Sequence, residues 1–157
     1  MTVHEQSESV SNEASATHIS FNWPVRVYYE DTDAGGIVYH ARYLHFLERA
    51  RTEWLRQFGF SQHTLKEQNT VFVVRDMSLK FMQPAKLDDE LTVTVEILNI
   101  KKASIQMQQS IYEGEHKKLL AQVTVACLDA DLLKPKAMPA EIRMAIEDKN
   151  TNEGVNL

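Results

Sequence analysis

The chain has 157 residues, of which 43% are hydrophobic and 25% charged, and its formal net charge at pH 7 is -5. This length suits one domain with a real core and is too short for two. The first 20 residues contribute -3 through Glu5, Glu8 and Glu13, and the remaining -2 is no electrostatic footprint for binding nucleic acid.

The first 20 residues are predicted to form a disordered acidic tail, because they are rich in Ser, Ala, Thr and Asn and offer little to bury. They lack the basic start and the apolar core of a secretory signal, and no apolar run in the chain approaches the ~20 residues that span a bilayer. We therefore expect a cytoplasmic protein with no membrane span. Residues 21–148 would form the single domain, and residues 149–157 a C-terminal tail.

A strand, a loop and a helix are predicted to open the domain. Residues 25–29 alternate between apolar and polar side chains, with Tyr29 on the apolar face, as in a half-buried strand. The acidic, glycine-containing loop 31–36 follows. From residue 43 to residue 58 apolar side chains recur at helical spacing, and Gly59 supplies the stop.

The charged side chains of this helix are predicted to form a solvated outer face. They are Glu48, Arg49, Arg51, Glu53 and Arg56. Arg49 and Glu53 have the i, i+4 spacing of an ion pair on a helix surface. We assign this face no chemistry.

Four further strands are predicted after the helix. The first spans residues 71–82 and ends before Pro84. Its predicted common face consists of Val73, Arg75, Met77, Leu79 and Phe81. Segments 91–97 and 103–111 alternate cleanly and are predicted to form a hairpin, and segment 119–127 is the last strand. The pattern indicates an antiparallel meander.

One strong helix preceded by one strand and followed by four indicates an α+β fold whose sheet wraps the helix. An extended connector at residues 134–139 and a short helix at residues 140–148 would complete it. Cys127, the single cysteine, lies in an apolar strand and is predicted to be a buried thiol. The sheet needs cover for its edge strand, so we expect a homodimer or a homotetramer.

The loop containing Asp31, Asp33, Gly35 and Gly36 allows four interpretations. It can be a plain turn, since Asp and Gly both favour turns. A calcium loop fails at Gly35, which offers no side-chain oxygen, and at Arg42, where a bidentate Glu is required. An aspartyl phosphotransferase would use the Asp-x-Asp pair but is typical of parallel sheets, which this pattern does not predict.

The fourth interpretation is a site for a substrate carbonyl at the start of the helix. Unpaired backbone amides and the helix dipole favour negative charge there, and no Ser, Thr, Asp or Asn lies between Ala34 and Arg51 to cap them. The amide of His40 matters more in this interpretation than its ring. Asp33 would stand across the carbonyl carbon and activate water or attack it directly. No His, Cys or acid spacing resembles a zinc set, so no metal is expected.

Residues 23–40, with the sequence WPVRVYYEDTDAGGIVYH, resemble the opening of the 4-hydroxybenzoyl-CoA thioesterase class of hotdog-fold proteins, in particular its Tol-Pal-associated acyl-CoA thioesterases. The resemblance continues through residues 48–53, 72–75 and 134–137, and it spans the chain from Trp23 to about Ile146. The loop is its specific part. The resemblance implies a hotdog fold, in which a curved antiparallel sheet wraps one long helix, with the site at the interface of a dimer or tetramer.

The resemblance also implies roles for residues of the loop. Asp33 corresponds to the catalytic carboxylate, and an amide at His40 or Tyr39 would polarise the thioester carbonyl, with Gly36 in the substrate-binding loop. Asp31 would shape the loop. No cofactor is implied, because CoA enters as part of the substrate. Basic candidates for its phosphates are Arg75, Lys101, Lys102, Lys134 and Lys136.

The implied activity is hydrolysis of short to medium acyl-CoA thioesters, and of acyl groups on acyl carrier protein as a further substrate. The alternative is a hotdog scaffold that binds acyl carrier protein or envelope-associated Tol-Pal partners with little hydrolysis. A hotdog dehydratase is a third possibility, but it generally pairs a His with an acid, and the sequence signals no such pair.

Overall fold

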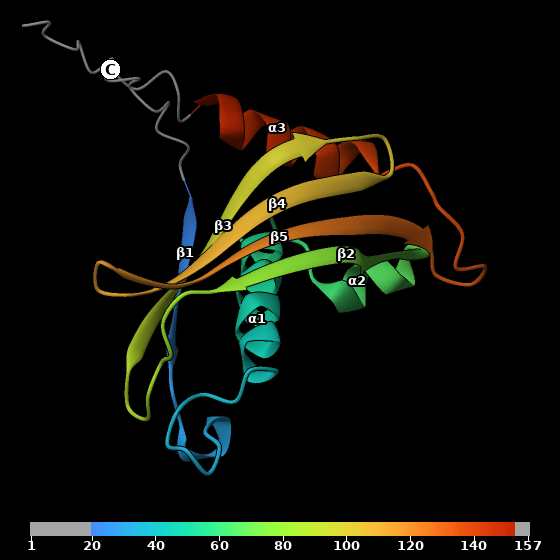
Figure 1. Ribbon diagram of the computed structural model, residues 1–157. Helices are drawn as coiled ribbons and strands as arrows, with labels where there is room; N and C mark the ends of the chain where they lie inside the picture. The colour runs from blue at the N-terminus through green and yellow to red at the C-terminus, as the bar shows by residue number, and fades with distance from the viewer. Residues whose placement is uncertain (1–19, 153–157) are drawn as a thin grey trace, which may run out of the picture.

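Five antiparallel strands form one curved sheet around a long helix in the computed structural model, which describes residues 20–152 (Figure 1). The strand order is β1-β3-β4-β5-β2. The strands are β1 (Phe21–Arg26), β2 (Thr70–Phe81), β3 (Glu90–Ile100), β4 (Ser104–Glu113) and β5 (His116–Asp129). The predicted α+β class and the predicted hairpin are confirmed, and β1 and β2 are the two edge strands. The tail predicted for residues 1–20 lies, except for Ser20, outside the described residues.

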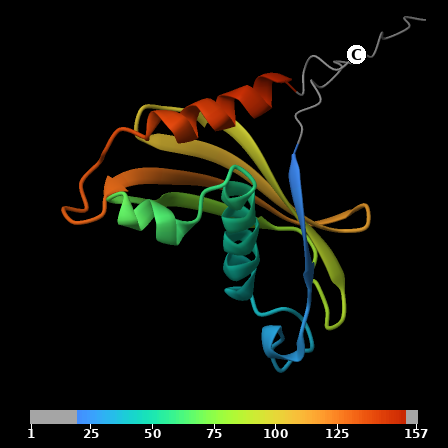
Figure 2. The same cartoon turned by 180° about the vertical axis from the view of Figure 1, so that it is seen from behind.

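Within residues 20–152, three α-helices accompany the sheet. They are α1 (Arg42–Arg56), α2 (Gln62–Glu67) and α3 (Ala140–Asn152). Figure 2 shows α1 and α3 on the same face of the sheet, and the side chains of Lys149 in α3 and Gln57 after α1 are hydrogen-bonded. α3 continues four residues past the predicted end at Asp148. No helix within residues 20–152 is both long and apolar enough to cross a membrane.

The core forms where the helical period of α1 meets the two-residue period of the strands. Phe46, Leu47 and Ala50 of α1 are fully buried, and so are Leu91 of β3 and Leu119 of β5. Burying an aliphatic or aromatic side chain of this size contributes about 1.5–3 kcal/mol. α1 is therefore held mainly by packing against the inner face of the sheet.

Two strand predictions were wrong in phase. Tyr29 is 83% exposed, because β1 ends at Arg26 and a short 3-10 helix, η1 (Tyr29–Asp31), redirects the chain. In β2 a bulge at Arg75 inserts one extra residue. Cross-strand pairing with β5 therefore places Phe72 and Val74, rather than Val73 and Arg75, on the inner face.

The predictions for the charged face of α1 were also partly wrong. Arg51 is turned inward and donates a hydrogen bond to the buried Gln109 of β4. The Arg49–Glu53 pair does not form, since Glu53 instead pairs with Arg56 at 2.6 Å. The prediction omitted α2, whose start is capped by Ser61: this side chain accepts a bond from the amide of Thr64 at 3.2 Å.

The start of α1 is tied to the turn between β2 and β3 by a buried tyrosine. The Tyr43 hydroxyl accepts a hydrogen bond from the amide of Ala85 at 3.0 Å, and both residues are buried. The Ala85 carbonyl accepts from the amide of Val38 at 2.9 Å. Ala85 thus links the loop before α1 to the first turn of α1.

Replacing Tyr43 by Phe removes only the hydroxyl, and we expect it to lower the free energy of unfolding by about 1–3 kcal/mol, because the buried Ala85 amide loses its partner. Urea denaturation followed by circular dichroism measures the change. The control is Tyr39→Phe, on a half-exposed ring, with an expected change of about 0.5 kcal/mol or less. Equal effects of the two variants would contradict the prediction.

Candidate functional site

A short ladder of backbone hydrogen bonds joins the acidic loop to the segment just before α1, at the bottom of the view in Figure 2. The Tyr39 amide donates to the Asp31 carbonyl at 2.9 Å, Thr32 pairs with Val38, and the Asp33 amide donates to the Ile37 carbonyl at 2.9 Å. The loop tip is therefore the turn at residues 34–36. Residues 37 and 38 are bonded in turn to the neighbouring segment 85–86.

Asp31 holds this loop from the inside. Its carboxylate is buried, accepts a hydrogen bond from Arg42 Nε at 2.6 Å and accepts another from the Tyr28 amide at 2.8 Å. The hydrogen bond to Asp31 raises the pKa of Arg42, and Glu30 adds a weaker pair with the same guanidinium at 3.4 Å. Both Asp31 oxygens are thus engaged within the loop, which fits the shaping role that the resemblance implied.

Asp33 is placed differently from Asp31. Its side chain is exposed, and its Oδ1 accepts a hydrogen bond from the Gly35 amide at 2.8 Å. Within residues 20–152 no group donates a hydrogen bond to Asp33 Oδ2. The contact with Gly35 limits the rotation of the carboxylate, and one oxygen remains available to a substrate or a water.

The backbone amides near α1 divide into engaged and free groups. Those of Tyr39 and Gly36 donate to the carbonyls of Asp31 and Asp33, so neither is free to bind a substrate oxygen. In the described part of the chain the His40 amide donates to no acceptor, and no side chain caps the helix at Ala41. Of the two amides that were candidates for binding the carbonyl oxygen, those of Tyr39 and His40, only the His40 amide is therefore free.

The two glycines serve the geometry of the turn. Gly36 has φ +77°, a left-handed conformation that costs other residues backbone strain. A Cβ on Gly35 would lie 3.1 Å from Asp33 Oδ1, so a side chain there would press on the carboxylate. The His40 ring is exposed and packs on the Tyr39 ring, with centroids 4.5 Å apart.

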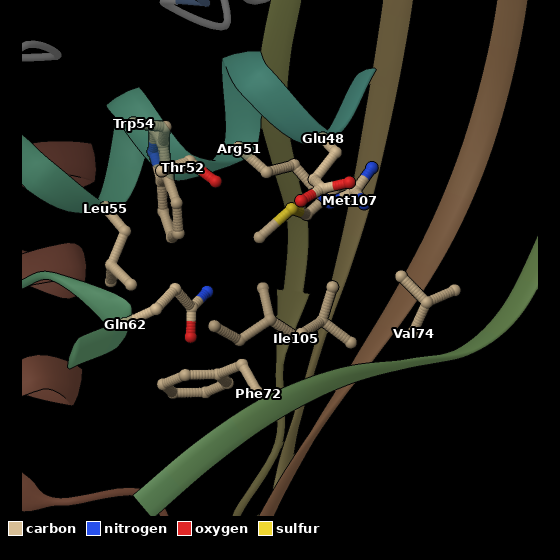
Figure 3. Close-up of a pocket in the computed structure, with 11 residues that line it drawn as sticks. Glu48, Arg51, Thr52, Trp54, Leu55, Gln62, Phe72, Val74, Ile105 and Met107 are labelled. Atoms are coloured by element: carbon tan, nitrogen blue, oxygen red, sulfur yellow. The ribbon is translucent and has the colours of Figure 1, made fainter. Parts of the chain in front are cut away.

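A separate cavity of about 300 Å³ lies between α1, the start of α2 and the inner face of the sheet (Figure 3). Trp54, Phe72, Ile105 and Met107 are among its apolar walls, and Arg51 reaches into it from α1. None of residues 31–40 lines this cavity. Within one chain the loop carboxylate and this cavity are therefore distinct features.

The inward position of Arg51 was not predicted, because the helical spacing of the charged residues assigns Arg51 to the solvated face. A usable signal lay in β4, where Ile105, Met107, Gln109 and Ile111 share the inner face of the strand. A single glutamine in an otherwise apolar register requires buried hydrogen-bond partners. Arg51 and the carbonyl of Leu47 are those partners.

Among the basic candidates for CoA phosphates, Lys136 is already engaged. Its ammonium donates to the Asn69 carbonyl and the Thr70 hydroxyl, both at 3.1 Å. Arg75, Lys101, Lys102 and Lys134 are exposed. In the described part of the chain no group of three or more His, Cys, Asp or Glu residues is arranged to hold a metal ion.

Cys127 is fully buried, as predicted. Burial raises the pKa of its thiol, and the nearby Lys136 charge only partly opposes this change. A buried thiol with a raised pKa is a weak nucleophile. The structure gives this cysteine a packing role.

Comparison with known proteins identifies relatives over most of the chain. Residues 27–146 match the thioesterase-like superfamily. The chain is 51% identical over 126 residues to the acyl-CoA thioesterase YbgC of Haemophilus influenzae, covering 80% of this chain and 93% of that protein. It is 44% identical over 128 residues to the acyl-CoA thioesterase YbgC of Helicobacter pylori, covering 80% and 85%. A crystal structure of a probable thioesterase from Bartonella henselae superimposes with a TM-score of 0.74 at 39% identity, covering 77% of this chain and 100% of that one.

The different settings of the two loop acids predict different effects on stability. Asp31→Asn should lower the free energy of unfolding by about 1.5–3 kcal/mol, because it weakens a buried, charge-assisted hydrogen bond to Arg42. Asp33→Asn, at an exposed position, should change it by about 0.5 kcal/mol or less. Chemical denaturation of both variants under one buffer condition measures the contrast. A larger loss for Asp33→Asn would show that the roles are reversed.

Proposed function

The chain belongs to the thioesterase-like superfamily, and on that premise we propose that it hydrolyses acyl-CoA thioesters of short to medium chain length. The observation that carries the proposal is that one loop holds a carboxylate that keeps one free oxygen and an unbonded amide just before α1. These groups belong to Asp33 and His40. A thioester on a carrier protein presents the same carbonyl and is included in the proposal.

The His40 amide would donate to the thioester carbonyl oxygen. Its N–H lies at the positive end of the 15-residue helix α1, where developing negative charge is favoured. A preorganised donor of this type is worth about 3–4 kcal/mol in the transition state. The His40 amide donates to no acceptor within residues 20–152, so it is available to a substrate oxygen.

Asp33 would supply the nucleophile in one of two ways. As a general base it takes a proton from water while the water oxygen bonds to the carbonyl carbon. The tetrahedral intermediate then expels CoA as a thiolate, which is protonated. As a nucleophile its own oxygen bonds to the carbonyl carbon, CoA leaves, and water hydrolyses the mixed anhydride. Single turnover in H₂¹⁸O tests for the second route: if water attacks the Asp33 carbonyl of the anhydride, the label enters Asp33, which the general-base route cannot produce.

A second copy of the chain would complete the site, since Asp33 in one chain is open to solvent. Large apolar side chains are exposed on the loop, on β2 and on the turn after it. They are Tyr28, Tyr29, Ile37, Tyr39, Val73, Val74, Phe81, Met82 and Leu87. β2 is a 12-residue edge strand, whose free backbone groups favour pairing with another strand. We therefore expect a homodimer or a higher homo-oligomer that covers β2 and the loop.

Asp33→Asn keeps the shape of the side chain and removes its charge, and we expect turnover of acyl-CoA to fall about 10²–10⁴-fold with little change in fold. Release of free CoA, detected with a thiol reagent, measures turnover. The matched control is Glu30→Gln, a neighbouring exposed acid that pairs with Arg42, and its turnover should stay near wild type. Wild-type rates for Asp33→Asn would refute the role of Asp33. A wild-type protein that hydrolyses no acyl-CoA would favour the scaffold alternative.

Val73→Lys places a charge on the exposed edge strand and should shift the protein toward the monomer, with a parallel loss of turnover. Light scattering gives the mass, and the thiol assay gives the activity. Leu132→Lys, at a 68% exposed position of the loop after β5, is the control and should alter neither. A fully active wild-type monomer would contradict the proposed covering of the site.

A further inference from the structure

Arg51 is held in a fixed position inside the cavity beside α1. Its Nη1 donates to the side-chain oxygen of Gln109 at 2.9 Å. The Gln109 nitrogen donates in turn to the carbonyl of Leu47 at 3.0 Å, and Gln109 is fully buried. The oxygen and the nitrogen of the Gln109 side-chain amide are thus both hydrogen-bonded, so Gln109 fixes the orientation of the Arg51 guanidinium.

The charge of Arg51 is not neutralised by a bonded carboxylate. No salt bridge within residues 20–152 includes it. Burial lowers its pKa, and the charge of Glu48, an exposed residue of the same helix that also lines the cavity, opposes this change. The hydrogen-bonded partner of Arg51 is the neutral Gln109, so the guanidinium keeps N–H donors for an anionic group although Glu48 offsets part of its charge.

The surroundings of Arg51 restrict what that group can be attached to. The cavity has a volume of about 300 Å³, near the lower end for small-molecule sites. Seven of its eleven lining residues are apolar, among them Trp54 and Leu55 of α1 and Phe72 of β2. The four polar ones are Glu48, Arg51, Thr52 and Gln62. Figure 3 shows Arg51 extending from α1 toward Met107, on the side away from Leu55. Such a space suits a hydrocarbon chain with one charged end.

The position of the cavity along α1 relates it to the loop. Arg51 lies nine residues after Arg42, which at 1.5 Å per residue is about 14 Å along the helix axis. A thioester bound at the start of α1 could therefore extend its acyl group along the helix toward Arg51. The free end of the chain, and not the thioester itself, would meet the guanidinium.

We propose that this cavity receives the far end of the acyl group and that Arg51 selects acyl chains that end in a carboxylate. The proposal rests on the function proposed above. Arg51 would determine specificity and would not take part in bond cleavage. A carboxylate is the best match, because a guanidinium binds it through parallel hydrogen bonds and gains the ionic attraction as well.

The test compares acyl-CoA pairs that differ only at the chain end. The pairs are succinyl and butyryl, adipoyl and hexanoyl, and suberoyl and octanoyl. For each pair the ratio of kcat/KM, carboxylate over methyl, is measured for the wild type and for Arg51→Gln. We expect the ratio to fall about tenfold in the variant for the pair whose end reaches Arg51, with kcat/KM for the methyl-ended substrate within about threefold of wild type.

Arg56→Gln is the matched control, because it removes the same charge from the same helix at an exposed site paired with Glu53. Its ratio should equal that of the wild type. Arg51→Lys, which keeps the cation, should retain part of the preference, and thermal melting confirms that each variant is folded. If Arg51→Gln does not fold, the wild-type ratios decide. A tenfold or greater preference for the methyl end in all three pairs overturns the inference.

The failure of this inference differs from failure of the proposed function. A wild type that cleaves none of the six substrates refutes the function itself. A wild type that cleaves methyl-ended substrates, with ratios that Arg51→Gln leaves unchanged, refutes only the role of Arg51. In that outcome the guanidinium is a structural partner of Gln109.

Discussion

The proposed site depends on the hydrogen bonds that the buried carboxylate of Asp31 accepts. This carboxylate joins the 3-10 turn after β1 to the first residue of α1, through the Tyr28 amide on one side and the Arg42 guanidinium on the other. This bond places a basic residue at the positive end of a helix, where it would ordinarily be unfavourable, and the acid offsets that charge. Both Asp31 oxygens are engaged in this way, and the His40 amide stays unbonded just before the helix.

The loop therefore divides its acids between structure and proposed chemistry. Asp31 is enclosed and fully bonded, whereas Asp33 two residues later stands at an exposed turn with one oxygen held by Gly35. Backbone hydrogen bonds between residues 31–33 and 37–39 join the segment that contains Asp33 to the segment that precedes His40. A reactive group kept apart from the groups that hold it can be changed at small cost to stability.

The inner face of the sheet contributes a second organised feature. The bulge at Arg75 changes the phase of β2, so that Phe72 and Val74 face α1 and line the cavity, while the basic side chain of Arg75 is left exposed. Opposite them, Gln109 interrupts an apolar strand and holds Arg51. Two departures from regular alternation, one in β2 and one in β4, thus give the cavity its walls and its charge.

The sequence by itself determined the fold class, the family and the loop acids. These follow from local patterns: the two-residue and 3.6-residue periods, Gly59 after the helix, and the specific run from Trp23 to His40. The tertiary structure decided that Arg51 turns inward, that Arg75 lies in a bulge, and that of the two candidate amides only that of His40 is free. Each of these depends on a partner distant in sequence, such as Gln109 for Arg51, and a local pattern carries no information about such pairs.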